Sequence, residues 1–201
     1  MDGLDILKKD WKKQEEHLPK FRKEEIYSML KKKSSSLVKW IFIVSILEFA
    51  FWIGLEIFSI IQGYNELFVE YELELTYNVI MIINYVIILG FISLFFYNYQ
   101  KIKITDNARR LMKKILNTRK MVKYYVWFNI IYFAITFMLV NFLVIQNMKE
   151  LQEVNIWLFM AIMFGIMLVF LVIIWLFYRL LYGILTRKLQ KNYEQLQNLD
   201  L

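Results

Sequence analysis

The sequence predicts an all-α protein: a four-helix transmembrane bundle with short amphipathic helices outside the membrane. Three observations predict this fold. Apolar residues make up 59% and aromatic residues 18% of the 201 residues, which exceeds the usual apolar share of soluble domains. The apolar residues gather into four long blocks, and nearly all charged residues lie between these blocks. The composition is therefore that of a polytopic membrane protein.

Each of the four apolar blocks is long enough to cross a bilayer as a helix, because about 20 residues rising ~1.5 Å each span the hydrocarbon layer. Unbroken runs such as 86–89, Val-Ile-Ile-Leu, lack the alternating polarity of barrel strands. The one proline, Pro19, precedes all four blocks. The predicted spans are residues 37–61, 77–97, 124–145 and 156–178, within a membrane domain of residues 37–183.

Residues 1–36 precede the first span and predict two short amphipathic helices that are separated at Pro19. Lysines surround the apolar face of the first helix. A basic amphipathic helix with a tryptophan can lie on an anionic membrane surface, or it can dock in a groove of a partner protein. The candidate partner-binding residues on the apolar faces are Leu4, Leu7, Trp11, Ile26 and Leu30.

The loop over residues 100–123 predicts a short basic helix that leads into the third span, with Thr105 or Asp106 as its cap. Contact with an anionic lipid leaflet accounts for its positive charge. The segment contains no recognisable nucleic-acid-binding motif, so we expect no nucleic-acid partner.

Residues 184–201 predict a C-terminal helix, whose apolar residues recur at alternating intervals of four and three. Such a seam favours self-association into a homo-oligomer, and a polar residue within it fixes the register. In the alternative interpretation, the helix extends the fourth span and packs on the N-terminal helices of its own chain. The candidate self-association residues are Leu185, Leu189, Asn192, Leu196 and Leu199.

The distribution of positive charge predicts the orientation in the membrane. Residues 1–40, 100–123 and 179–201 hold 24 of the 25 lysines and arginines. Because positive residues near spans are retained on the cytoplasmic side, we expect a multi-pass protein of the bacterial inner membrane with both termini in the cytoplasm. Its cytoplasmic face is expected to contact anionic lipids.

Five of the polar residues within the predicted spans are candidates for a functional or structural role. We expect Glu48 near the bilayer centre with Thr136 at a similar depth, and Glu56, Asn84 and Asn141 in a layer nearer the outer face. A carboxyl group at that depth must be neutralised or paired. Glu48 is either a proton or cation site, or a carboxyl group that hydrogen-bonds a neighbouring helix and holds the bundle together. We favour the structural interpretation.

Small residues recur four positions apart in the first and fourth spans. Such pairs allow close approach of two helix backbones, within one chain or between two chains. The predicted helix-packing residues are Ala50, Gly54, Ala161 and Gly165.

The sequence contains no catalytic or metal-binding motif. It has no cysteine, a single histidine (His17) and only six glycines. Thiol chemistry is thereby excluded, and phosphate-binding loops and sharp catalytic turns depend on glycine. We expect no metal, no cofactor and no enzymatic activity.

Residues 7–16, LKKDWKKQEE, and residues 31–49, KKKSSSLVKWIFIVSILEF, resemble segments of small uncharacterised four-span inner-membrane proteins of Gram-negative bacteria. Some of these carry the name carotene monooxygenase. That enzyme family uses a β-propeller and four iron-binding histidines, whereas this chain has only His17. In outline the layout also resembles membrane-held anti-sigma factors, although it lacks the cysteines of their zinc-binding motif.

The leading functional hypothesis is a non-enzymatic inner-membrane protein whose cytoplasmic helices bind a protein partner, such as a sequestered sigma factor. The first alternative is a small transporter or proton-coupled channel component that uses Glu48. The second alternative is an accessory subunit of a larger membrane complex.

Overall fold

The computed structural model describes residue 8 and residues 22–63, 66, 69, 73–105, 107–147 and 155–200. These residues contain four long α-helices and no strand. The expected all-α four-helix bundle is therefore confirmed. The helices are α2 (Lys23–Ile61), α4 (Glu74–Lys103), α5 (Ala108–Asn147) and α6 (Ile156–Asp200).

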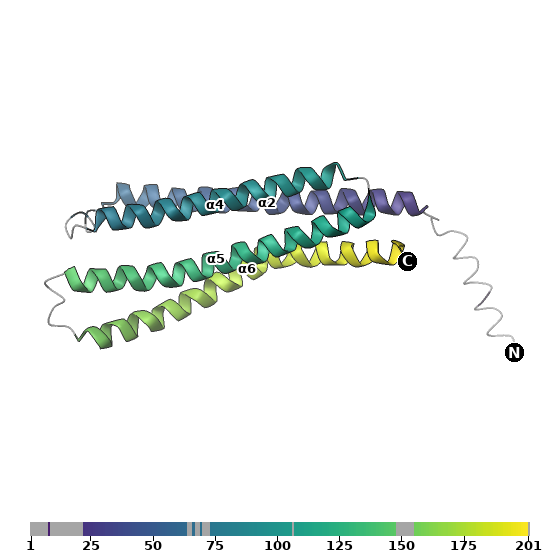
Figure 1. Ribbon diagram of the computed structural model, residues 1–201. Coiled ribbons are helices and arrows are strands. Elements are labelled where there is room, and N and C mark those ends of the chain that lie inside the picture. The colour runs from purple at the N-terminus through teal and green to yellow at the C-terminus, as the bar shows by residue number, and fades with distance from the viewer. Residues whose placement is uncertain are drawn as a thin grey trace.

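The four helices lie side by side and alternate in direction (Figure 1). Each helix packs on the next one along the chain, and α2 also packs on α6, which closes the bundle. The start of α2, the turn between α4 and α5, and the end of α6 all lie at one end of the bundle (Figure 1).

Charge divides the bundle along its length into a basic half and an apolar half. All lysines and arginines of the four helices lie in the basic half, and the described charged residues of the apolar half are Glu48, Glu56 and Glu74. The basic half comprises residues 22–39, 101–123 and 179–200, and the apolar half comprises residues 40–61, 74–100, 124–147 and 156–178.

All four helices are long and apolar enough to cross a membrane. In the apolar half, large apolar side chains from every helix face outward, among them Leu47, Val86, Ile135 and Leu158, each at least 60% exposed. A water-soluble protein would not leave so much apolar surface uncovered. These features are those of a multi-pass membrane protein.

Three helices, α2, α5 and α6, extend well beyond the predicted spans. The predicted boundary between residues 36 and 37 falls inside α2, which runs without a break from Lys23 to Ile61. The predicted boundary between residues 183 and 184 likewise falls inside α6. The span prediction depended on hydropathy, and hydropathy marks where the apolar surface ends rather than where the backbone hydrogen bonding ends.

The cap of α5 differs from the expected residues. The Asn107 side chain accepts hydrogen bonds from the backbone N–H groups of Arg109 (2.9 Å) and Arg110 (3.4 Å). Thr105 instead donates its hydroxyl hydrogen to the carbonyl oxygen of Lys101, and Asp106 lies outside the described residues. Threonine, aspartate and asparagine are all favoured at the N-cap of a helix. The residue types at positions 105–107 therefore could not show which of the three caps α5.

The apolar seam of the C-terminal segment packs inside its own chain, so the self-association prediction is wrong for the residues that the structure describes. Leu189, Asn192 and Leu196 are buried, and Leu185 packs against the same core. The Asn192 amide donates a hydrogen bond to the Ser34 hydroxyl of α2 (3.1 Å). This is the intrachain alternative stated above. The side chain of Leu199 lies outside the described residues.

The partner-binding prediction also needs correction. Leu30 is buried in the core of the basic half, and Ile26 packs against that core. Leu30 is therefore not available to a partner, and Ile26 is only partly exposed, because α2 packs this face against the neighbouring helices. Leu4, Leu7 and Trp11 lie outside the described residues, as does His17.

The small residues of the first and fourth spans do not pack helix against helix. Ala50, Gly54, Ala161 and Gly165 are all exposed, and a Cβ atom added at Gly54 or Gly165 would meet no heavy atom within 4 Å. The prediction of a close α2–α6 approach at these residues is therefore wrong. The prediction was based on their similar depths along the two spans, but the four residues lie on the outward faces of α2 and α6.

Replacing Gly54 and Gly165 by alanine is expected to leave the fold intact and to raise the free energy of unfolding by about 0.5–1 kcal/mol per site, because alanine has the better helix propensity. Thermal unfolding in detergent measures this. Gly63→Ala is the contrasting variant, because Gly63 has a φ of 74° and alanine there should destabilise the chain. Lower stability of the Gly54 and Gly165 variants would show that these residues form a packing contact.

Candidate functional site

A cavity of about 330 Å³ lies between the four helices in the apolar half. Side chains of all four helices line it, which is the usual construction of ligand sites in helix bundles. Its size falls at the lower end of the range for small-molecule sites. The lining residues are Trp52, Leu55 and Glu56 of α2, Met81, Asn84, Tyr85 and Ile88 of α4, Asn129, Tyr132, Phe133 and Thr136 of α5, and Ile174 and Tyr178 of α6.

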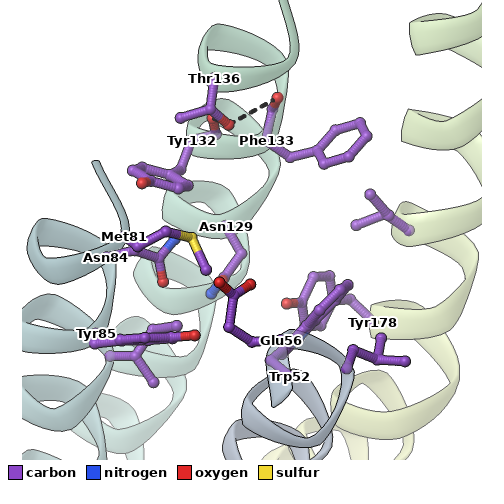
Figure 2. Close-up of a pocket in the computed structure, with 13 residues that line it drawn as sticks. Trp52, Glu56, Met81, Asn84, Tyr85, Asn129, Tyr132, Phe133, Thr136 and Tyr178 are labelled. Carbon is purple, nitrogen blue, oxygen red and sulfur yellow. Dashed lines mark hydrogen bonds between the residues drawn. The ribbon is translucent and has the colours of Figure 1, made fainter. Parts of the chain in front are cut away.

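The charged group of the cavity is the carboxylate of Glu56. Figure 2 shows it pointing into the space between Asn129, Tyr85 and Tyr178. The Tyr77 hydroxyl lies 2.7 Å and 2.8 Å from its two oxygens and donates a hydrogen bond to them. Because one hydroxyl donates only one hydrogen, the carboxylate keeps free acceptor capacity. Among the described lining residues there is no lysine, arginine or histidine to neutralise it.

The neutral polar groups of the wall are largely satisfied by the protein. Asn129 donates its amide hydrogen to the Tyr125 carbonyl oxygen (2.8 Å), and the Tyr132 hydroxyl donates to the Ile80 carbonyl oxygen (2.6 Å). Thr136 donates to the Tyr132 carbonyl oxygen (2.7 Å). These bonds fix the side chains in place and leave Glu56 as the strongest site of attraction.

Aromatic rings supply much of the remaining wall. Trp52, Tyr85, Tyr132, Phe133 and Tyr178 line the cavity. The face of an aromatic ring attracts a cation, and tryptophan and tyrosine do so most strongly. A carboxylate surrounded by aromatic rings is therefore suited to a cationic ligand that also has apolar surface.

A second carboxyl group, that of Glu48, is buried between the cavity and the basic half. It accepts hydrogen bonds from the hydroxyls of Tyr178 (2.5 Å) and Tyr182 (2.9 Å) of α6. The Tyr125 ring packs against both tyrosines, with centroid distances of 6.2 Å and 5.6 Å. Tyr178 belongs to both sites, because its ring lines the cavity while its hydroxyl is occupied by Glu48.

The partners of Glu48 lie close to positive residues of the neighbouring helices. Tyr178 and Tyr182 flank Arg179, and Tyr125 is two residues from Lys123. The ring of Phe49, next to Glu48 on α2, contacts the ring of Tyr85, which lies near the middle of the apolar part of α4. The expected position of Glu48 near the bilayer centre stays a prediction.

The predicted polar residues of the spans separate into three places. Glu56, Asn84 and Thr136 line the same cavity. Thr136 therefore lies beside Glu56 and not at the level of Glu48, as had been expected. Asn141 does not line the cavity, and its amide donates to the Phe137 carbonyl oxygen of its own helix (2.8 Å).

Several cavity residues were not predicted. The tyrosines and tryptophan resemble the interfacial aromatic residues that are common at span ends, and Asn129 lies close to the end of its block. A signal did exist, because Asn129, Tyr132, Phe133 and Thr136 recur at intervals that place them on one face of α5. The unpredicted polar and aromatic residues of the cavity are Trp52, Tyr85, Asn129, Tyr132, Phe133 and Tyr178. The hydrogen-bond donors Tyr77, to Glu56, and Tyr182, to Glu48, were also not predicted.

Within the described residues, no group of three or more histidine, cysteine, aspartate or glutamate side chains could hold a metal ion. Glu48 and Glu56 are two turns apart on α2, and each has its own tyrosine partners.

No curated protein and no solved structure matches this chain. A family model described as a domain of unknown function, DUF8845, matches residues 24–201. The matched part includes nearly all of α2 and the whole of α4, α5 and α6, and the chain thus belongs to the DUF8845 family.

Proposed function

We propose that this protein binds a small organic cation within the membrane and acts as the substrate-binding component of a small transporter. The observation that carries this proposal is the carboxylate of Glu56, which faces a cavity whose described lining contains no positive side chain. A carboxyl group in such surroundings must be neutralised or paired with a positive group. A cationic ligand would supply the positive group.

The shape and chemistry of the wall favour an ammonium group attached to an apolar body. The aromatic rings would surround the cationic head, and Leu55, Ile88 and Ile174 would contact the apolar body. A metal ion is a poor candidate, because the wall supplies one carboxylate and no cluster of ligands. An anion would be repelled by Glu56.

In this proposal Glu56 is the binding residue, and Glu48 is a positioning residue. The Tyr178 hydroxyl donates its hydrogen to Glu48 (2.5 Å), and this bond would fix Tyr178 in the cavity wall. This differs from the sequence-based alternative, in which Glu48 itself was the transport site.

The proposal is tested by titrating the purified chain with phenyltrimethylammonium and with its neutral isostere tert-butylbenzene. We expect at least tenfold tighter binding of the cation, since cation–π and carboxylate contacts each contribute roughly 1–2 kcal/mol in a desolvated site. Uptake of the radiolabelled cation into liposomes then separates transport from binding. Equal affinity for the two compounds would refute cation recognition.

A second candidate function is the binding of a protein partner at the basic half. The observation that favours it is the length of the basic half, since α6 continues for 22 residues beyond Tyr178, about 33 Å of helix. Because the described helices bury their own apolar seam, such binding would depend on the residues before Arg22. Loss of a copurifying partner, such as a sequestered sigma factor or a larger complex, on deletion of residues 1–21 would support it.

We also propose that the protein lies in a bacterial inner membrane with both termini in the cytoplasm. The positive charges of all four helices gather at one end, as the positive-inside rule requires. The chain has no native cysteine, so single introduced cysteines report cleanly on their side of the membrane.

Cysteines introduced at Glu74 and Asn155 are expected to react with a membrane-impermeant maleimide added to spheroplasts. Cysteines at Lys32 and Lys188 should react only after permeabilisation. All four side chains are exposed, two at each end of the bundle. Labelling of Lys32→Cys and Lys188→Cys from opposite sides would contradict the proposed topology.

A further inference from the structure

A second hollow, of about 560 Å³, lies at the turn between α4 and α5. Four basic residues line it: Lys101 from the last turn of α4, and Arg110, Lys113 and Lys114 from the first turns of α5. The intervals of three and four residues place the α5 side chains on one face of the helix. The hollow is far along the bundle from Glu56 and shares no residue with the cation cavity.

Positive charge is concentrated among the described residues that line this hollow. The ammonium groups of Lys101 and Lys114 lie 5.3 Å and 5.7 Å from the centroid of the same Tyr97 ring. No aspartate or glutamate is among the described residues that line the hollow. Like charges gathered in one hollow repel each other, so an anion bound beside them would be favourable.

The end of α5 adds to the attraction. The first turn of a helix carries a partial positive charge from its free N–H groups. Asn107 already accepts hydrogen bonds from Arg109 and Arg110 N–H groups, so an incoming anion would be held by side chains, with the helix end contributing mainly through its field.

The position of the hollow identifies the source of the anion. Tyr97 is the last residue of the apolar block of α4, and Lys101 follows one turn later. The neighbouring Leu94 and Phe96 are exposed apolar side chains. The hollow thus lies where the apolar surface ends, which is where the phosphate groups of lipids lie. The exposed apolar residues would contact the acyl chains of the same lipid.

We propose that this hollow binds the phosphate group of an anionic phospholipid. Lys101 and Lys114, which both lie beside the Tyr97 ring, contact the phosphate, and Arg110 and Lys113 hold the outer edge of the headgroup. This site is independent of the proposed cation site.

The test uses the purified full chain in a neutral detergent, titrated with dioctanoyl phosphatidylglycerol and followed by native mass spectrometry. The double variant K101Q/K114Q should bind the lipid on the order of 30-fold more weakly, because each lysine near a lipid headgroup has a substantial effect. The matched control is K32Q/K120Q, which removes two exposed lysines of the basic half outside the hollow and should change the affinity less than twofold.

Two further results decide the proposal. Equal weakening in both double variants would show diffuse attraction by the whole basic half and would overturn the site. Inorganic phosphate is titrated in parallel, and binding of phosphate as tight as that of the lipid, with the same dependence on Lys101 and Lys114, would overturn the lipid as the source. Phenyltrimethylammonium binding should be unchanged in K101Q/K114Q, so that failure of one proposal leaves the other open to its own test.

Discussion

Replacing Glu48 by leucine is expected to lower the free energy of unfolding by about 2–4 kcal/mol, because the hydroxyls of Tyr178 and Tyr182 would remain buried without their acceptor. Each unsatisfied hydroxyl costs on the order of 1–2 kcal/mol inside a membrane bundle. Titration with sodium dodecyl sulfate, followed by circular dichroism, measures the midpoint of unfolding.

A rescue variant makes this prediction specific. In the triple variant E48L/Y178F/Y182F both donors and the acceptor are replaced by apolar groups, and most of the lost stability should return, since removing all partners of a buried hydrogen bond is nearly neutral. Glu194→Leu is the matched control, because Glu194 is exposed in the basic half and its loss should change stability by less than about 0.5 kcal/mol. A triple variant no more stable than E48L would contradict the role assigned to these hydrogen bonds.

Replacing Glu56 by glutamine is expected to weaken phenyltrimethylammonium binding on the order of 30-fold, because truncating one partner of a desolvated charge pair typically costs 2 kcal/mol or more. Tyr77→Phe should weaken binding less, roughly fivefold, since the carboxylate keeps its charge and loses the hydroxyl that orients it. Isothermal titration calorimetry in detergent measures both affinities.

The matched control for Glu56 is Glu74→Gln. Glu74 is exposed at the start of α4, in the same half of the bundle but outside the cavity, and its replacement should leave the affinity unchanged. Binding of tert-butylbenzene should be the same in E56Q as in the unmodified chain, which would show that the cavity is intact. Equal losses in the Glu56 and Glu74 variants would mean that overall charge, and not a site, attracts the cation.

The position of each apolar helix in the sequence was predictable, because it depends on the summed transfer free energy of neighbouring residues. A block such as residues 156–178 is apolar throughout, and every residue adds to the free energy of transfer into lipid, wherever its side chain points. Hydropathy summed over neighbouring residues could not distinguish the end of the apolar surface from the end of the helix. It therefore missed the continuation of α2 back to Lys23, and it left the continuation of α6 to Asp200 as one of two interpretations.

The candidate site was predictable only in part. Glu56, Asn84 and Thr136 were recognised as polar residues in apolar surroundings, but their common cavity was not. In a membrane protein both the lipid-facing and the bundle-facing sides of a helix are apolar, so periodicity says little about the rotation of a span. Gly54 and Gly165 show the same limit, because the spacing that predicted a contact also fits an outward face.

The sequence by itself determined that four apolar helices form this protein and that its positive charge gathers at one end, because both properties are sums over neighbouring residues. Only the tertiary structure decided that Glu48 meets the tyrosines of α6, that Glu56 faces the cavity and that Asn192 bonds Ser34. These pairings depend on the rotation and register of helices that are distant in the chain. Side-chain packing sets both, and no local property of the sequence records them.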